Sequence, residues 1–208
     1  MPSLATARTH RLYALFVVAL GLGLRRGELL GLRWADVDFA TGQLRVWRTL
    51  QRVKGDGVVY GPPKSRRSRR VLTMPGVVAA AVRKHRKRQD AERADAGEAW
   101  TDTSLVFTTA TGRHAEPRNL NTVFGRLVVR AGVRPIRLHD LRHTCATLLL
   151  SRGVSPRMVM DILGHWQIAV TMNTYGHVIP AMQQEAAGHM DAALGEVPEP
   201  GEETPDEI

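Results

Sequence analysis

The spacing of hydrophobic residues changes twice along the chain, from helical to extended and back to helical. Residues 10–22 form an apolar run that predicts a buried helix, and residues 26–34 place leucines on one side of a second helix. Three short runs of β-branched, aromatic and aliphatic residues then predict strands at 44–47, 58–60 and 71–74. The residues at 54–57 supply turn chemistry between the first two runs, so a hairpin is expected there.

Helical spacing returns after Pro75 and continues almost to the end of the chain. Residues 105–107 read as a short strand or an extended link, and Ser155 and Pro156 suit the cap and the first position of a helix. The expected helices are 75–93, 118–131, 138–152, 155–163, 169–175 and 180–194. This order predicts an α+β fold that is mainly α, a helical bundle with a small three-stranded antiparallel sheet.

Charge divides the 208 residues into a cationic body and an acidic end. Residues 1–193 hold 29 basic against 14 acidic residues, whereas the last 15 residues hold six acidic residues and no basic one. A field of +15 concentrates polyanions, and double-stranded DNA is the expected partner, with an anionic membrane surface as the rival. We expect one domain over residues 1–194 and a disordered acidic tail over 195–208.

Two further features bear on the compartment. The longest apolar stretch, residues 13–24, is shorter than the roughly 20 residues of a spanning helix, so no integral membrane segment is expected. The single cysteine, Cys145, excludes a disulfide framework and fits a reducing compartment. We therefore expect a cytoplasmic protein.

Two basic runs, at residues 64–70 and 83–88, are candidates for contacts with phosphate. Mobile cations at the spacing of a nucleic-acid backbone give affinity that does not depend on sequence, although either run alone is equally typical of a solvated face. The expected DNA contacts are Arg66, Arg67, Arg69, Arg70, Arg83, Lys84, Arg86, Lys87 and Arg88.

His139 and Arg142 stand three residues apart on one expected helix, so their side chains can reach a common phosphate. An imidazole can accept or donate a proton, and a guanidinium binds two phosphate oxygens at once. Taken alone, the pair is more often an ordinary surface feature. His139 and His143 also have the spacing of two zinc ligands, but no HExxH pattern accompanies them, so no metal is expected.

Four stretches of sequence resemble the catalytic domain of the tyrosine recombinases, the phage integrase family. They are GLGLRRGELLGLRW, PPKSRRSRRVLTMP, LHDLRHTCATLLL and LGHWQIAVTMNTYGH. The resemblance extends over about residues 8–194. It implies site-specific cleavage and rejoining of DNA, as in the integrase of a phage or other mobile element, without a metal or a cofactor.

The resemblance also implies roles for individual residues. Tyr175 would attack a DNA phosphorus to form a 3′-phosphotyrosyl link. Arg25 and Arg142 would bind the non-bridging oxygens of the transition state, and Lys64 would protonate the leaving 5′-oxygen. The plainer alternatives are a cation at a helix start for Arg25 and one more phosphate contact for Lys64.

Three further residues complete the implied site. His139 and His165 would hydrogen-bond the phosphate, and His139 would also accept the tyrosine proton. Glu28 would support the site from behind. His165 could instead be a partner of a helix C-terminus.

The resemblance also implies a setting. Members usually carry an N-terminal core-binding domain, which is expected to be absent here, and act as a tetramer in synapsis on DNA, which would place this protein at the nucleoid. Residues 180–194 would then pack on a neighbouring protomer.

Two alternative functions remain. One is a fragment that binds DNA without recombining it, and the other is a regulator whose residues 141–165 form a helix-turn-helix around Ala146, Gly153 and Val159.

Overall fold

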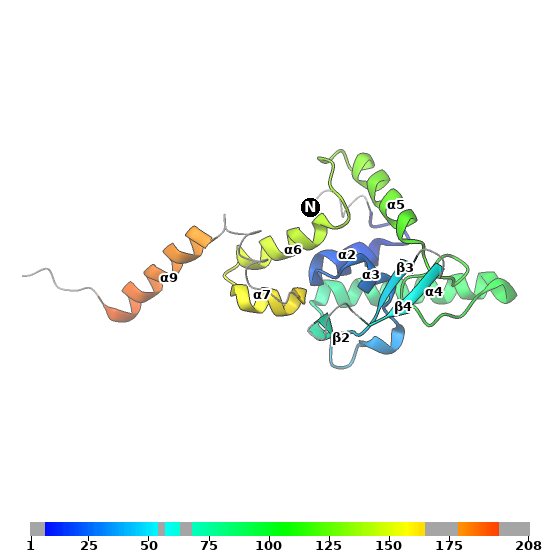
Figure 1. The fold of residues 1–208 in the computed structure, drawn as a ribbon, viewed down its shortest axis with the longest axis horizontal. Helices are drawn as coiled ribbons and strands as arrows, with labels where there is room; N and C mark the ends of the chain where they lie inside the picture. Colours follow the sequence, from blue (N-terminus) through cyan, green and yellow to red (C-terminus); the bar gives the residue numbers. More distant parts are fainter. Residues whose placement is uncertain (1–6, 54–56, 63–67, 165–178, 196–208) are drawn as a thin grey trace, which may run out of the picture.

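Figure 1 presents the chain as a computed structural model, which describes residues 7–53, 57–62, 68–164 and 179–195. The fold is mainly helical with small antiparallel sheets, as predicted. Its elements in chain order are α2 (Tyr13–Leu22), α3 (Arg26–Leu30), η1 (Trp34–Asp36), β1 (Val37–Asp38), β2 (Gln43–Val46), β3 (Thr49–Val53), β4 (Gly57–Gly61), β5 (Arg70–Thr73), α4 (Gly76–Ala96), η3 (Gly97–Ala99), α5 (Pro117–Arg130), α6 (Asp140–Leu150), α7 (Pro156–Leu163) and α9 (Ile179–Leu194).

Helix α2 is the central helix of the core and contacts α3, α4 and α6. Residues 14–19 and Leu22 are all buried, because a helix that is apolar on every side needs neighbours all round it. The helix ends at Gly23, whose φ is 62°. A Cβ at this position would overlap Cδ2 of Leu163, so glycine is required both by the backbone and by the space.

A three-stranded antiparallel sheet is present, but its strands differ from those expected. The first and third expected runs pair as β2 and β5, with Leu44 opposite Leu72, and β1 adds the third strand. The second run lies in β4, which pairs with β3 in a separate two-stranded sheet. β3 was missed because its only hydrophobic residues are Leu50 and Val53. Residues 54–56 of the predicted turn lie outside the described residues, between the end of β3 and the start of β4.

The separate hairpin is held close against α3. A Cβ on Gly27 would come within 2.6 Å of Oγ1 of Thr49, and one on Gly31 within 3.1 Å of the backbone of Thr49 and Leu50. Two glycines at α3 therefore let β3 approach the helix backbone directly. β3 therefore packs on α3, the short helix that begins after Arg25, and it pairs with β4 and not with β2.

Helices α6 and α7 pack together around a small second core. Ala146 and Leu150 of α6 contact Val159 and Leu163 of α7, and all four are buried. The Ser155 hydroxyl accepts a hydrogen bond from the N–H of residue 158 at 3.3 Å, and Pro156 opens the helix. The predicted cap is therefore confirmed.

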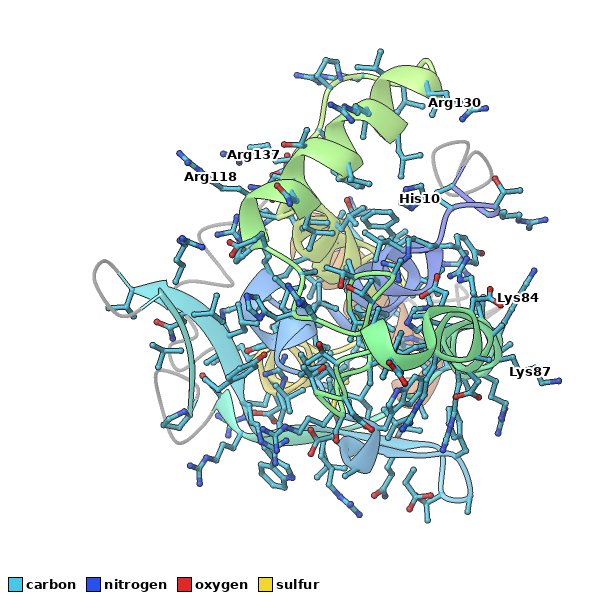
Figure 2. All side chains as sticks on the ribbon, turned by 90° about the vertical axis from the view of Figure 1, so that its right-hand side faces the viewer. His10, Lys84, Lys87, Arg118, Arg130 and Arg137 are labelled. Atoms are coloured by element: carbon cyan, nitrogen blue, oxygen red, sulfur yellow. The ribbon has the colours of Figure 1, made fainter. Side chains whose placement is uncertain are left out.

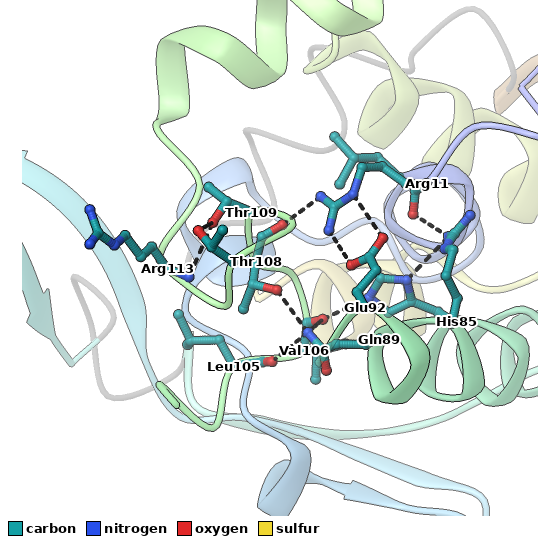
Figure 3. A network of polar contacts seen from close by, with 12 residues as sticks. Arg11, His85, Gln89, Glu92, Leu105, Val106, Thr108, Thr109 and Arg113 are labelled. Carbon is teal, nitrogen blue, oxygen red and sulfur yellow. Dashed lines mark hydrogen bonds and ion pairs between the residues drawn. The ribbon is translucent and has the colours of Figure 1, made fainter. Parts of the chain in front are cut away.

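A buried polar network joins the start of the chain to α4 and to residues 105–113 (Figure 3). Arg11 pairs with Glu92 at 2.6 Å and donates to the carbonyl oxygen of Thr108 at 2.6 Å. Gln89 donates to the hydroxyl of Thr108, and Nε2 of His85 lies 2.7 Å from the carbonyl oxygen of Val106. The segment expected as a strand or link is thus a buried stretch tied to α4, with an isolated bridge from Leu105 to Arg33 and no strand of its own.

The C-terminal part of the described chain is the helix α9, close to its predicted bounds. Its described side chains, such as Met190 and His189, are exposed. The helix expected at 169–175 and the tail from 196 onward lie outside the described residues. Within the described ranges, no helix combines the length and the hydrophobicity needed to cross a membrane.

Candidate active site

The C-terminal end of α7 is the point at which three arginine side chains from distant parts of the chain meet. The carbonyl oxygens of residues 162, 163 and 164 accept hydrogen bonds in turn from Arg70 at 2.6 Å, Arg142 at 2.6 Å and Arg25 at 3.3 Å. The last carbonyls of a helix have no partner within it and carry partial negative charge. The helix end therefore provides an anchor for guanidinium groups.

Arg142 is the most deeply buried of the three predicted catalytic residues that the structure describes. It lies on the first turn of α6 and is 3% exposed. Its Nη1 donates to the carbonyl oxygen of Gly23 at 2.5 Å, and its Nη2 donates to that of Leu163 at 2.6 Å. Two carbonyls from two different elements thus fix the plane of this guanidinium.

Arg25 precedes α3 and is held by Glu28. The backbone N–H of Arg25 donates to one carboxylate oxygen of Glu28 at 2.9 Å, and Nη1 donates to the other at 3.0 Å. The first bond is half of a capping box. The side chain of Arg25 remains 39% exposed, so its guanidinium is both oriented and accessible.

Glu28 is an ionised carboxylate inside the protein, with 3% of its surface exposed. Burial alone would raise the pKa of Glu28, but the charges and hydrogen bonds of Arg70 and Arg25 outweigh it and hold the pKa below its ordinary value. The carboxylate is therefore a fixed negative charge between two arginines.

Arg70, one of the expected DNA contacts, is buried and paired within the protein. Its side chain is 7% exposed, and its Nη1 and Nη2 donate to the two oxygens of Glu28 at 3.2 and 3.0 Å. Its Nε is taken by the carbonyl oxygen of Ile162. The sequence showed a cation in a basic run, but the buried carboxylate that pairs with it lies 42 residues away in the sequence.

His139 lies just before α6, with its ring edge-on to that of His143 at a centroid distance of 5.0 Å. Desolvation lowers the pKa of His139, and the neighbouring charges of His143 and Arg142 lower it further. Its imidazole is therefore neutral at pH 7 and available as a proton acceptor. The described residues contain no group of three or more His, Cys, Asp or Glu arranged to hold a metal ion.

A groove of about 610 Å³ opens beside His139, between α5 and the segment that leads into α6. Arg26 and Arg137 contribute charge, and Asn121 contributes an amide. The groove is lined by Arg26, Asn121, Phe124, Gly125, Ile136, Arg137, Leu138 and His139. A cationic surface therefore adjoins the site.

The second basic run, residues 83–88, lies on α4, and its side chains have different surroundings. Lys84 and Lys87 project into solvent, on the side of Figure 2 opposite to Arg137. Arg83 and Arg86 are exposed but lie over aromatic rings at centroid distances of 5.0 and 5.2 Å.

Arg88, another of the expected DNA contacts, is partly buried and forms hydrogen bonds within the protein. It donates to the carbonyl oxygens of His10 and Arg11, and so it ties α4 to the start of the chain. Its Nη2 also lies 3.3 Å from Nδ1 of His85, so these contacts give Arg88 a structural role.

Several predicted residues lie outside the described part of the chain: Lys64, Arg66, Arg67, His165 and Tyr175. Of the remaining predicted site residues, the structure brings Arg25, Glu28 and Arg142 together through the end of α7, and puts His139 three residues before Arg142 at the start of α6. Arg69 is exposed beside the buried Arg70.

Sequence reasoning missed the anchor that unites these residues. The carbonyls at the end of α7 are main-chain groups, which every residue has, so no residue type in the sequence predicts this anchor. The only available signal was Gly164, which has a φ of 65° and marks the end of a helix in the left-handed conformation.

Comparison with known proteins shows the family of this chain. The model of the phage integrase family matches residues 3–182, so this chain belongs to that family. It is 39% identical over 188 residues to a XerC-like tyrosine recombinase of Caldanaerobacter subterraneus subsp. tengcongensis, covering 85% of this chain and 48% of that protein. It is 31% identical to an integrase of Saccharopolyspora erythraea, covering 85% and 52%. The chain thus spans about half the length of these curated relatives.

Solved structures share the fold. The Tn1549 transposon integrase, solved in complex with transposon right end DNA, superposes with a TM-score of 0.77 at 26% identity, covering 93% of this chain and 63% of that one. The XerA recombinase superposes with a TM-score of 0.69 at 24% identity, covering 91% and 61%, and shares the fold.

Proposed function

We propose that this protein cleaves and rejoins double-stranded DNA as a site-specific recombinase, through a 3′-phosphotyrosyl intermediate. The observation that carries the proposal is the pair of guanidiniums, Arg25 and Arg142, anchored on adjacent carbonyls of one helix end. Two fixed cations at one point can stabilise the negative charge that develops on the phosphate oxygens in the transition state. Membership of the phage integrase family supports the same reaction.

The proposed step balances without a cofactor. The Tyr175 oxygen forms a bond to phosphorus while the bond from phosphorus to the 5′-oxygen breaks. His139 accepts the phenolic proton, and Lys64 donates a proton to the leaving oxygen. His165 hydrogen-bonds the phosphate. Attack by the released 5′-hydroxyl on the phosphotyrosine reverses the step, so the phosphodiester energy is kept in the covalent link.

Double-stranded DNA is the proposed partner. The groove beside His139 adds Arg26 and Arg137 to the cations predicted from the sequence. Such contacts position a backbone without reading its sequence. Action on DNA would take place in the cytoplasm at the nucleoid.

A synaptic tetramer is the proposed assembly. α9 is a helix whose described side chains are exposed, Met190 by 56%, so it has an apolar surface to offer a neighbouring protomer. Deleting residues 180–208 should weaken protomer association on DNA, as followed by analytical ultracentrifugation, while the melting of the remaining domain is unchanged. Deleting only 195–208 should change neither, because that acidic segment has little apolar surface to bury.

The two alternatives make different predictions. A helix-turn-helix regulator would use α6 and α7 to read DNA, yet Arg142 of α6 is buried against Gly23 and Leu163. A DNA-binding fragment would bind but form no covalent adduct. Both alternatives bind DNA, so binding alone does not discriminate among the three.

The decisive experiment is a search for the covalent adduct. Duplexes of random sequence, each nicked near its centre, allow a short 5′-hydroxyl product to diffuse away, so the phosphotyrosyl protein accumulates. Denaturing gels detect the adduct, and sequencing of the attached DNA identifies the site. Tyr175→Phe should abolish the adduct, whereas Tyr60→Phe, a matched loss of one hydroxyl, should not.

Two results would overturn the proposal. An adduct that persists in Tyr175→Phe would exclude Tyr175 as the nucleophile, and no adduct in the whole pool would favour the binding fragment. Adding EDTA should leave the yield unchanged, since the arginines take the place of a metal.

A further inference from the structure

We propose that Arg70 is a positioning residue of the reaction: it orients Arg25 through Glu28 and through the end of α7, and it does not contact DNA. The inference rests on the proposed function, because it assigns a role in the same site. It concerns a residue that the sequence pattern grouped with the DNA-binding cations.

The guanidinium of Arg70 is enclosed by protein on all its edges. Nη1 and Nη2 reach the two oxygens of Glu28 at 3.2 and 3.0 Å, which is the forked geometry that an arginine forms with a carboxylate. Nη1 also donates to the carbonyl oxygen of Ser68 at 2.9 Å, and Nε donates to that of Ile162 at 2.6 Å. At 7% exposure, little of the side chain is left for a phosphate.

Arg70 acts on Arg25 first through Glu28. Each carboxylate oxygen of Glu28 accepts one bond from Arg25 and one from Arg70. A carboxylate buried to this depth is costly unless it is compensated, and Arg70 is the deeper of the two compensating charges. Without Arg70, Glu28 would lose the partner that holds its plane, and Arg25 would lose its fixed acceptor.

The second route runs through the end of α7. Nε of Arg70 holds the carbonyl of Ile162, and a Cβ on Gly164 would lie 2.9 Å from its Nη1, so the guanidinium packs against the turn itself. The carbonyl of Gly164 is the second acceptor for Arg25. Both described acceptors of the Arg25 guanidinium are therefore positioned by the same side chain.

The expected consequence is a loss of rate without a loss of affinity. A displacement of about 1 Å in a reacting group can cost about 100-fold in rate. DNA binding depends on many exposed phosphate contacts, so it should be insensitive to a buried arginine.

The test uses the full chain and the nicked duplex identified above, with variants Arg70→Met and Arg70→Lys. At saturating DNA, Arg70→Met should form the adduct about 100-fold more slowly, with the dissociation constant and its salt dependence unchanged. Arg70→Lys should recover part of the rate, since it restores the charge but not the fork. Arg157→Met, which removes an exposed arginine of α7, should match the wild type.

A double variant, Arg70→Met with Glu28→Met, separates positioning from stability. Replacing both members of a buried pair with apolar residues should restore thermal stability that Arg70→Met loses. The rate should stay low, because Arg25 still lacks its oriented partner. This variant and Arg70→Lys carry the test if Arg70→Met does not fold.

Three outcomes would overturn the inference. A salt-dependence slope reduced by about 1 in Arg70→Met or in the double variant would make Arg70 a phosphate contact. A wild-type rate in Arg70→Met would show that Arg70 does not position Arg25. A double variant that recovers both stability and rate would show that Arg70 and Glu28 only stabilise the fold. Absence of adduct in the wild type would instead overturn the proposed function, while the salt measurement would still decide whether Arg70 contacts DNA.

Discussion

Arg142 donates a hydrogen bond to the carbonyl oxygen of Leu163 at 2.6 Å, so a side chain at the start of α6 satisfies a main-chain acceptor at the end of α7. One guanidinium thus has a structural and a proposed catalytic role, and the two can be separated by substitution.

Arg142→Ala should reduce the rate of adduct formation by about 10²- to 10³-fold, because it removes a donor to the transition state. It also leaves the buried carbonyls of Gly23 and Leu163 without this donor, at a cost of about 1–3 kcal/mol each. Arg25→Ala should give a similar loss of rate with a smaller loss of stability, since Arg25 is 39% exposed. Single-turnover kinetics and urea unfolding measure the two effects. Equal losses of stability in the two variants would contradict this division.

Gly23→Ala should destabilise the protein and slow cleavage. Gly23 has a φ of 62°, and an added Cβ would overlap the side chain of Leu163. Gly42→Ala is a matched control, with a φ of 68° and no heavy atom within 4 Å of the added Cβ. Backbone strain of about 1–3 kcal/mol is common to both variants, so the larger loss expected in Gly23→Ala isolates the steric effect. Thermal melts of equal depression would refute the need for this close approach.

Lys64→Ala should slow cleavage of ordinary DNA much more than cleavage of a substrate whose leaving 5′-oxygen is replaced by sulfur. A thiolate leaves without receiving a proton, so the variant loses nothing with that substrate. Parallel rates on the two substrates are the measurement. If Lys64→Ala is equally slow on both, Lys64 is not the proton donor.

The combined replacement of Arg66, Arg67 and Arg69 by glutamine should reduce the slope of log affinity against log salt, by about 1 for each phosphate that is no longer neutralised. Arg70 and Arg88 are excluded from the set, because both are engaged inside the protein. Fluorescence anisotropy over a salt series gives the slope. An unchanged slope would show that this run does not bind phosphate.

The protein should lose stability as the pH falls below about 6.5, the ordinary value for histidine. Burial lowers the pKa of His85 in the folded state, so the unfolded chain takes up a proton at a higher pH than the folded chain. The unfolded state is then favoured by up to about 1.4 kcal/mol per pH unit. His85→Gln retains a donor for Val106 and an acceptor for Arg88 but does not titrate. Urea unfolding across the pH range around that value should therefore show a smaller loss in the variant, and identical losses would rule out His85 as a source.

Most of the described helices were predictable because their apolar spacing is strong and because Ser155 and Pro156 have standard cap chemistry. The helix expected at 26–34 is shorter, since α3 ends at Leu30 and a 3-10 turn follows at Trp34–Asp36. The hairpin was harder, since β3 owes its place to the close approach allowed by Gly27 and Gly31 and not to its own hydrophobicity. A hydrophobic pattern reports burial along one segment, and it carries no information about which distant backbone lies against it.

The candidate site was likewise predictable only where local sequence motifs identify its residues. Arg25, Glu28 and Arg142 were identified from local motifs, and the structure brings them together. Arg70 and Arg88 were assigned to the surface because a run of basic residues shows charge but not the partner of each charge. Their acceptors lie 42 and 77 residues away in the sequence.

The site has no local precursor during folding. α3 has five residues, too few for a helix to persist alone in water. The hydrogen bonds that hold Arg25 to Gly164 and Arg142 to Gly23 join residues 139 and 119 positions apart. Such bonds form only after the ends of long chain segments have met. A partly folded chain therefore carries its positive charge before Arg25 and Arg142 are fixed at one helix end, and the proposed cleavage would require the completed fold.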